Sequence, residues 1–251
     1  MTPRKREVSQ ELTQKEQWDK EYKASQMLSP SNVPQADVVR FTRWLKKNAK
    51  KSGAPIEIDE MSVLDLGSGT GRNSFYYAQQ GATVIGYELS DTALAMAQKF
   101  ARHGEVTVTY KKQDIGVAYQ LPTESIDIVL DITSSNSLSD KKRELYLSES
   151  FRVLKPGGHM VVRALAKDGD SNVKALMARE PGIDPDTYVH PDLGLVEKVF
   201  SRESFTTLYG AKFEILDLAR VSHYNMVAGR KYKRNYWIAY LKKPDTEVEV
   251  G

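Results

Sequence analysis

Three glycines alternate with small polar residues directly after a short apolar run, at Gly67, Gly69 and Gly71. The run at residues 63–66 is typical of a buried parallel strand, and a helical pattern begins at Arg72. Glycine allows positive φ in a turn and lets the backbone approach a ligand closely. The helix that follows would direct its free N–H groups and the positive end of its dipole into the same space. This stretch therefore predicts a ligand-binding turn between a strand and a helix.

Glu88 is expected at the end of the next strand, residues 82–88, about 20 residues after the glycines. An acid in that place binds ribose hydroxyls, so the ligand has an adenosine-like half. The dinucleotide pattern Gly-x-Gly-x-x-Gly is not met, because Arg72 stands three residues after Gly69. Asp65, inside the first strand, would repel a pyrophosphate and could attract a cationic amino group. A cationic adenosine cofactor without phosphate fits these features best, and S-adenosylmethionine is such a molecule.

The segment from Asp65 to Gly71, together with Glu88, resembles the class I S-adenosylmethionine-dependent methyltransferases. Three later segments are similar to that family in order and spacing: residues 113–115 after a strand, residues 125–131 as the fourth strand, and residues 152–158 before the fifth strand. The resemblance implies a Rossmann-like α/β fold. Its sheet would have seven mostly parallel strands, with helices on both faces and an antiparallel terminal hairpin.

The same resemblance implies that S-adenosylmethionine binds at the carboxyl ends of the strands. The expected cofactor-binding residues are Asp65, Gly67, Ser68, Gly69, Gly71, Asn73, Glu88, Leu89, Asp114, Ile115 and Asp131. Two of these acids also have plainer interpretations: Asp114 as an ordinary turn acid and Asp131 as a helix or loop cap. No metal ligand is expected.

Trp18 and Tyr22 are four residues apart and share a face if residues 11–23 form a helix. A similar Trp-Asp-x-x-Tyr stands near the start of tellurite-resistance and thiopurine methyltransferases, which implies an aromatic lid over the cofactor or substrate. The alternative is a helix that two aromatic side chains dock on the core. A long loop at residues 181–191 is expected to overhang the active site and select the substrate. The expected substrate or lid residues are Trp18, Tyr22, Arg163, Tyr188 and His190.

Methyl transfer from a sulfonium is an in-line displacement, so catalysis depends mainly on holding the nucleophile and the methyl group in line. A base is needed only when the nucleophile is protonated. The candidates are His190, His223 and Tyr224, and a structural role is open for each histidine. Residues 131–134 replace the Asp/Asn-Pro-Pro-aromatic signature of exocyclic amine methylation, which argues against DNA adenine or cytosine N4 as acceptor. We expect a small-molecule acceptor; the alternatives are RNA or protein methylation and a non-catalytic cofactor-binding partner subunit.

Four cations and a tyrosine occupy residues 230–234, between the last two expected strands at 213–219 and 236–241. They could bind an anionic substrate or an RNA backbone. The plainer interpretation is a solvated hairpin that keeps an edge strand from pairing with other chains. The third strand is expected at residues 106–110.

The chain has 251 residues and a net charge of +3, which suit one α/β domain with extensions and do not by themselves imply a nucleic-acid partner. It has no cysteine, which excludes disulfides and cysteine-ligated zinc. Because no apolar run reaches the roughly 18–20 residues of a membrane span and no signal-peptide core is visible, we expect a cytoplasmic protein. The expected organisation is a disordered tail (1–10), a helical lid or extension (11–52), a methyltransferase domain (53–243) with a substrate-loop insertion at about 166–200, and a second tail (244–251).

Overall fold

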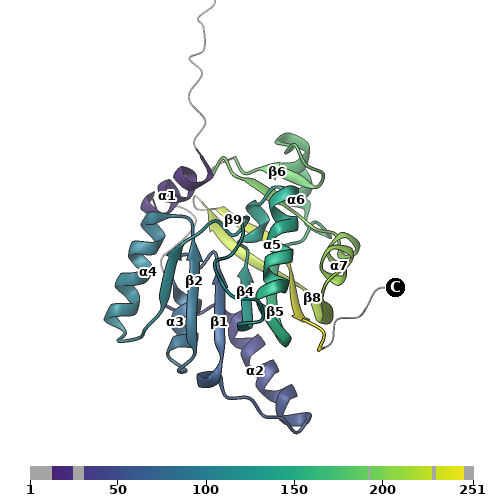
Figure 1. Ribbon diagram of the computed structural model, residues 1–251. Helices are drawn as coiled ribbons and strands as arrows, with labels where there is room; N and C mark the ends of the chain where they lie inside the picture. Colours follow the sequence, from purple (N-terminus) through teal and green to yellow (C-terminus); the bar gives the residue numbers. More distant parts are fainter. Residues whose placement is uncertain (1–12, 25–30, 192, 228–229, 246–251) are drawn as a thin grey trace, which may run out of the picture.

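A seven-stranded sheet forms the centre of the molecule (Figure 1). The computed structural model describes residues 13–24, 31–191, 193–227 and 230–245, and its strand order is β3-β2-β1-β4-β5-β9-β8. The first five strands in the chain run parallel, and β9 and β8 are antiparallel additions at one edge. The strands are β1 (Ser62–Leu66), β2 (Thr83–Glu88), β3 (Thr109–Lys112), β4 (Ile126–Ile132), β5 (Leu154–Leu165), β8 (Glu214–Val227) and β9 (Arg230–Lys242). The expected Rossmann-like fold with an antiparallel terminal hairpin is confirmed.

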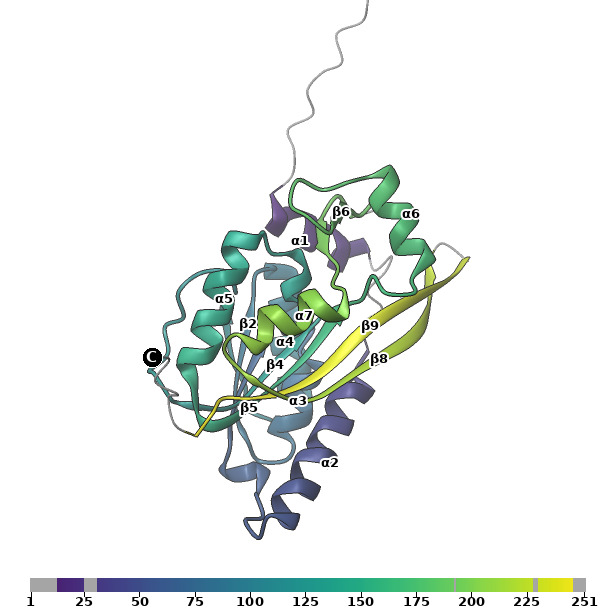
Figure 2. The ribbon, with the colours of Figure 1, turned by 90° about the vertical axis from the view of Figure 1, so that its right-hand side faces the viewer.

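Helices cover both faces of this sheet (Figure 2). They are α1 (Gln14–Ala24), α2 (Ala36–Lys51), α3 (Arg72–Ala78), α4 (Asp91–His103), α5 (Asp140–Val153), α6 (Ser171–Arg179) and α7 (Arg202–Gly210), with short 3₁₀ turns η1 (Ile58–Glu60) and η2 (Ser135–Ser137). One apolar core joins the sheet to α5 and α7, and the other joins it to α2 and α3. None of the helices in the described part of the chain is long and apolar enough to cross a membrane.

The central strands read as continuous apolar runs because both of their faces are buried. In β4, Ile128 and Leu130 belong to the core under α2, whereas Val129 belongs to the core under α5. Serines cap α4, α5 and α7; at the start of α4, for example, Ser90 Oγ accepts from the N–H of Ala93. The parallel strands therefore end along one edge of the sheet, where the helices begin.

The structure corrects three expectations: where the third strand begins, that residues 181–191 are a loop, and how long the last two strands are. The third strand begins at Thr109 rather than at residue 106, since the N–H of Val106 still donates to Ala101 in the last turn of α4. The segment at 181–191 is not all loop, because it contains β6 (Thr187–Val189), which pairs with β7 (Val196–Lys198) in a separate small sheet.

The last two strands are much longer than expected, so residues 230–234 are part of strand β9. The polar ends of β8 and β9 pair with each other from Ser222 and Asn235 outward, and a ladder of backbone hydrogen bonds needs no apolar side chains. The expected tail at residues 1–10 lies outside the described residues.

Candidate active site

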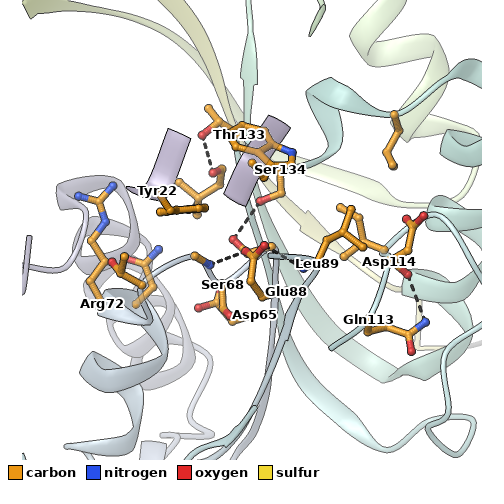
Figure 3. Close-up of a pocket in the computed structure, with 18 of the residues that line it drawn as sticks. Tyr22, Asp65, Ser68, Arg72, Glu88, Leu89, Gln113, Asp114, Thr133 and Ser134 are labelled. Atoms are coloured by element: carbon orange, nitrogen blue, oxygen red, sulfur yellow. Dashed lines mark hydrogen bonds between the residues drawn. The ribbon is translucent and has the colours of Figure 1, made fainter. Parts of the chain in front are cut away.

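A pocket lies at the carboxyl ends of β1, β2 and β4 and is also lined by residues of α1 (Figure 3). The expected cofactor residues that line it are Asp65, Gly67, Ser68, Gly69, Asn73, Glu88, Leu89, Asp114 and Ile115. Figure 3 shows Arg72 and Asp114 on opposite sides of the pocket, with Glu88 between them. The pocket is therefore long, and chemically different groups stand at its two ends and its middle.

The glycine turn has the backbone that the sequence predicts. Gly67, Gly69 and Gly71 have φ values of 66°, 55° and 86°. A Cβ on Gly67 would come within 2.5 Å of Ser134 Oγ, and one on Gly69 within 2.7 Å of the Tyr22 hydroxyl. Gly71 does not line the pocket; a Cβ there would meet the Tyr110 hydroxyl at 2.2 Å, so this glycine serves the packing behind the turn.

Glu88 is held entirely by backbone N–H groups. Its Oε2 accepts from Gly69 at 2.8 Å, and its Oε1 accepts from Leu89 and from Ser90, each at 2.8 Å. Burial raises the pKa of the carboxyl, and the three N–H donors oppose that shift. An ionised carboxylate has about four acceptor positions, so Glu88 joins the glycine turn to the start of α4 and keeps an acceptor position for a ligand hydroxyl.

Asp65 and Arg72 stand before and after the glycine turn and carry opposite charges. Asp65 is buried, its Oδ2 accepts from Ser74 Oγ at 2.6 Å, and burial raises its pKa to about 6. Arg72 is half-buried, and its guanidinium makes no hydrogen bond or ion pair with any other described residue. Burial lowers the pKa of Arg72, and the nearby positive charge of Arg163 lowers it further. The sequence marked Arg72 only as a departure from the dinucleotide pattern.

The opposite end of the pocket is formed by Asp114 and Ile115. Asp114 Oδ1 accepts from the N–H of Gly116 at 2.7 Å, and Oδ2 pairs with Lys142 Nζ at 2.5 Å. The carboxylate is thus a turn acid, as the plainer interpretation had it, and also lies at the pocket wall.

Another wall of the pocket, formed by residues 133–138, is fixed from beneath by buried polar groups. Asp131 is fully buried, does not line the pocket, and accepts from the N–H groups of Ser134 and Ser135 and from the Tyr146 hydroxyl. It therefore caps the loop, which is the alternative that the sequence left open. Arg143, which sequence reasoning missed, is 2% exposed and donates to the carbonyls of Ser135 and Leu138, each at 2.6 Å.

Helix α1 covers the pocket with Trp18 and Tyr22, both of which line it. Polar contacts hold the helix in place. Asp19 Oδ1 accepts from Ser90 Oγ at 2.6 Å and from the N–H of Thr92 at 3.0 Å, and Gln17 donates to the carbonyl of Gly194 at 2.9 Å. The aspartate of the Trp-Asp-x-x-Tyr stretch thus ties α1 to the start of α4, next to Glu88.

Comparison with known proteins agrees with this geometry. Residues 63–158 match the model of a methyltransferase domain family. The ubiquinone biosynthesis O-methyltransferase of Pseudomonas fluorescens is 26% identical over 167 residues, covering 60% of this chain and 71% of the relative. That of Bradyrhizobium sp. is 30% identical over 138 residues, covering 55% of this chain and 52% of the relative. The chain belongs to the class I S-adenosylmethionine-dependent methyltransferases.

Solved structures share the fold of this methyltransferase. An S-adenosylmethionine-dependent methyltransferase from Methanosarcina mazei superposes with a TM-score of 0.64 at 19% identity, covering 74% of this chain and 93% of the other. TehB from Haemophilus influenzae gives a TM-score of 0.58 at 17% identity, covering 91% of this chain and 67% of the other.

The cofactor of this methyltransferase is S-adenosylmethionine, as the sequence predicted. The pocket fits that molecule. The glycine turn leaves room for close approach, a buried acid and an unpaired arginine flank the turn, and a second acid stands between the two ends.

Besides Gly71 and Asp131, five expected residues of the methyltransferase do not line this pocket: Arg163, Tyr188, His190, His223 and Tyr224. Tyr188 is buried and its hydroxyl contacts Glu197 and Arg234, which join the small sheet to β9. His190 is 5% exposed at the end of β6, and Tyr224 is 60% exposed on β8. Of the three candidate bases, His190 is buried outside the pocket, and His223 and Tyr224 lie on the edge strand β8. The sequence alone could not place them there.

Proposed function

We propose that this methyltransferase methylates a small molecule that binds beside the cofactor, between the carboxyl ends of β4 and β5 and residues 166–200. The observation that carries the proposal is the covered pocket: α1 closes it from above, and the loop at 133–138 closes it from the side. Such an enclosure suits a compact acceptor rather than a polymer. The curated relatives, which are named as ubiquinone biosynthesis O-methyltransferases, support a small-molecule acceptor.

Each end of the pocket has a proposed role in holding S-adenosylmethionine. Asp65 attracts the ammonium group and Arg72 the carboxylate, since the two oppositely charged side chains flank the glycine turn. Glu88 accepts a hydrogen bond from a ribose hydroxyl, and Asp114 with Ile115 contacts the adenine. When bound, the cofactor would supply an electrophilic methyl group on its sulfonium. A nucleophile that attacks in line would take the methyl group, and the sulfur would leave as a thioether.

The chain contributes mainly position and exclusion of water. Trp18 and Tyr22 cover the pocket, and the backbone of the glycine turn and of residues 133–138 fixes its shape. Well-oriented reactants can gain roughly 7–11 kcal/mol of the barrier from alignment alone. We infer that alignment dominates here, because none of the three candidate bases lines the described pocket.

RNA methylation receives less support from the basic segment at 230–234 than the sequence allowed. Arg234 donates to the Tyr188 hydroxyl at 2.6 Å and lies 3.7 Å from Glu197, so its charge is used inside the molecule. We propose instead that residues 166–200 form a cap over the acceptor. Their small sheet is anchored to β9 by Arg234, and their Gly194 carbonyl contacts α1.

Calorimetric titration with S-adenosylmethionine, S-adenosylhomocysteine and NAD tests the cofactor roles. We expect micromolar binding of the first two and none of NAD, and loss of S-adenosylmethionine affinity in Arg72→Gln. An Arg72→Gln variant with unchanged affinity would remove this residue from the cofactor site.

The acceptor class is tested with radiolabelled S-adenosylmethionine and a cell extract divided into small-molecule, RNA and protein fractions. We expect the label in the small-molecule fraction. Label confined to RNA or protein would contradict the proposal.

A further inference from the structure

Arg163 lies at the carboxyl end of β5, directly beside the proposed acceptor space. It pairs with Ile132 in the register of β4 and β5, and its carbonyl accepts from the N–H of Thr133 at 2.8 Å. Both Ile132 and Thr133 line the pocket. Because paired residues of neighbouring strands point to the same face, the Arg163 side chain extends from the same face as that of Ile132, one strand further from the cofactor.

The Arg163 guanidinium is placed but not fully paired. It lies over the ring of Tyr236, 3.9 Å from the centroid, and one of its nitrogens is 3.6 Å from Asp37 Oδ2 at the start of α2. Its Nε is buried and has no hydrogen-bond partner in the described structure. The ring of His223 lies edge-on to the same tyrosine, 5.8 Å between the ring centroids, and its Nε2 is also buried without a partner in the described structure.

The charges around Arg163 do not balance. Asp37 is 2% exposed and is shared, because its other oxygen binds the guanidinium of Arg40. The charge of Arg163 is felt by Arg72 and by His223, and in both it lowers the pKa in addition to the effect of burial. If the cofactor carboxylate meets Arg72, one positive charge is still in excess here. A partly buried charge of this kind is costly unless a ligand brings the opposite charge.

We propose that Arg163 binds a carboxylate of the acceptor, so that the acceptor of this methyltransferase is a small carboxylic acid. The inference rests on the proposed function, since it names the substrate class of the same site. A guanidinium suits this role because its fork of donors matches the two oxygens of a carboxylate. Trp18 and Tyr22 line the same pocket as Ile132 and Thr133, and Tyr236 lies under the guanidinium; these aromatic side chains favour an acid with a planar ring.

The test uses the full chain saturated with S-adenosylhomocysteine and two probes of the same shape, 4-hydroxybenzoate and its neutral amide 4-hydroxybenzamide. Calorimetry should show that the acid binds at least about tenfold more tightly than the amide, the effect of one charge-assisted contact. In Arg163→Gln this preference should disappear while the affinity for S-adenosylhomocysteine stays unchanged. Equal affinity of the two probes for the wild type, or no binding of either, would overturn the proposal.

Arg40→Gln is the matched control, because Arg40 contacts the same Asp37 but is 54% exposed. If Arg163 only neutralises Asp37, both variants should lose the preference alike. If Arg163 binds the acceptor, Arg40→Gln should keep the preference for the acid, and Arg163→Lys should keep part of that preference. Circular dichroism checks that each variant folds. The first titration separates the two hypotheses: failure to bind S-adenosylhomocysteine contradicts the proposed function, whereas normal binding without acid preference contradicts only the acidic acceptor.

Discussion

The cofactor pocket and the proposed acceptor site hold their charged groups in different ways. On the cofactor side, backbone N–H groups of neighbouring segments surround Glu88. On the acceptor side, side chains from distant segments meet: Asp37 with Arg163, and Arg234 with Tyr188 and Glu197. Glu88 is thus fixed by chain geometry. The pairs on the acceptor side depend on side-chain identity, as do Asp65 with Ser74 and Asp114 with Lys142 in the cofactor pocket.

This difference has a functional consequence. An acid held by backbone N–H groups keeps its place when neighbouring side chains change, as long as the glycine turn is kept. A site made by pairs of side chains changes with each substitution. The acceptor side is therefore where relatives of this methyltransferase can differ in substrate.

The largest expected effect comes from Gly71→Ala, which strains the backbone of the glycine turn. Its positive φ and the close Tyr110 hydroxyl should together cost about 3 kcal/mol of unfolding free energy. Gly53→Ala is the control, because Gly53 has a φ of 80° but no atom within 4 Å of a Cβ, so about 1 kcal/mol is expected. Urea unfolding measures both, and equal losses would show that packing behind the turn is unimportant.

Glu88→Gln comes next. The amide NH₂ of the glutamine would face the N–H groups that the carboxylate now accepts from. The substitution should therefore weaken binding of S-adenosylhomocysteine at least about tenfold and lower the free energy of unfolding by about 1–3 kcal/mol. Calorimetry and urea unfolding give the two values. Glu144→Gln, at an exposed position on α5, should change neither. Unchanged affinity in Glu88→Gln would contradict the proposed ribose contact.

Cofactor binding should depend on pH through Asp65, because its folded pKa of about 6 lies above the unfolded value of about 3.9. If the ionised carboxylate attracts the cofactor ammonium, affinity for S-adenosylmethionine should fall by about tenfold from pH 7.5 to pH 5. The contribution of this group to stability runs the opposite way: it is present below about pH 4 and is lost as the pH rises through 6. Asp65→Asn should remove both trends; affinity independent of pH in the wild type would exclude the ammonium contact.

The smallest effect is expected on the acceptor side. Tyr188→Phe removes the hydroxyl between Glu197 and Arg234 and should cost about 1.5 kcal/mol of stability without changing cofactor affinity. A double-mutant cycle with Arg234→Met, followed by urea unfolding, measures the coupling between the two residues. A weakened cofactor affinity in Tyr188→Phe would mean that the two sides of the pocket are not independent.

The cofactor side was largely predictable because its signals are local. A strand, three glycines and a helix are contiguous, and the ends of parallel strands meet at one edge, so Glu88, Asp114 and Ile115 could be placed beside the turn. The sequence could not tell that Asp131 turns away to cap a loop. An acid at the end of a strand has the same local pattern whether it faces a ligand or its own backbone.

Buried polar groups that hold the walls were not predictable. Arg143 and Asp19 look like ordinary charges on helices, yet one fixes the loop at 133–138 and the other ties α1 to α4. Their role depends on which segment packs against the helix, and that segment is distant in sequence. The lengths of β8 and β9 were missed for a related reason, since each strand is stabilised by its partner rather than by its own apolar pattern.

The sequence by itself determined the fold class, the cofactor and the place of the glycine turn, because these follow from short-range spacing and from the shared direction of parallel strands. Only the tertiary structure decided which of the candidate side chains reach the pocket, and that Arg163, Asp37 and Tyr236 meet beside it. Apolar packing leaves a periodic pattern in the sequence, but specific contacts between polar side chains of distant segments do not.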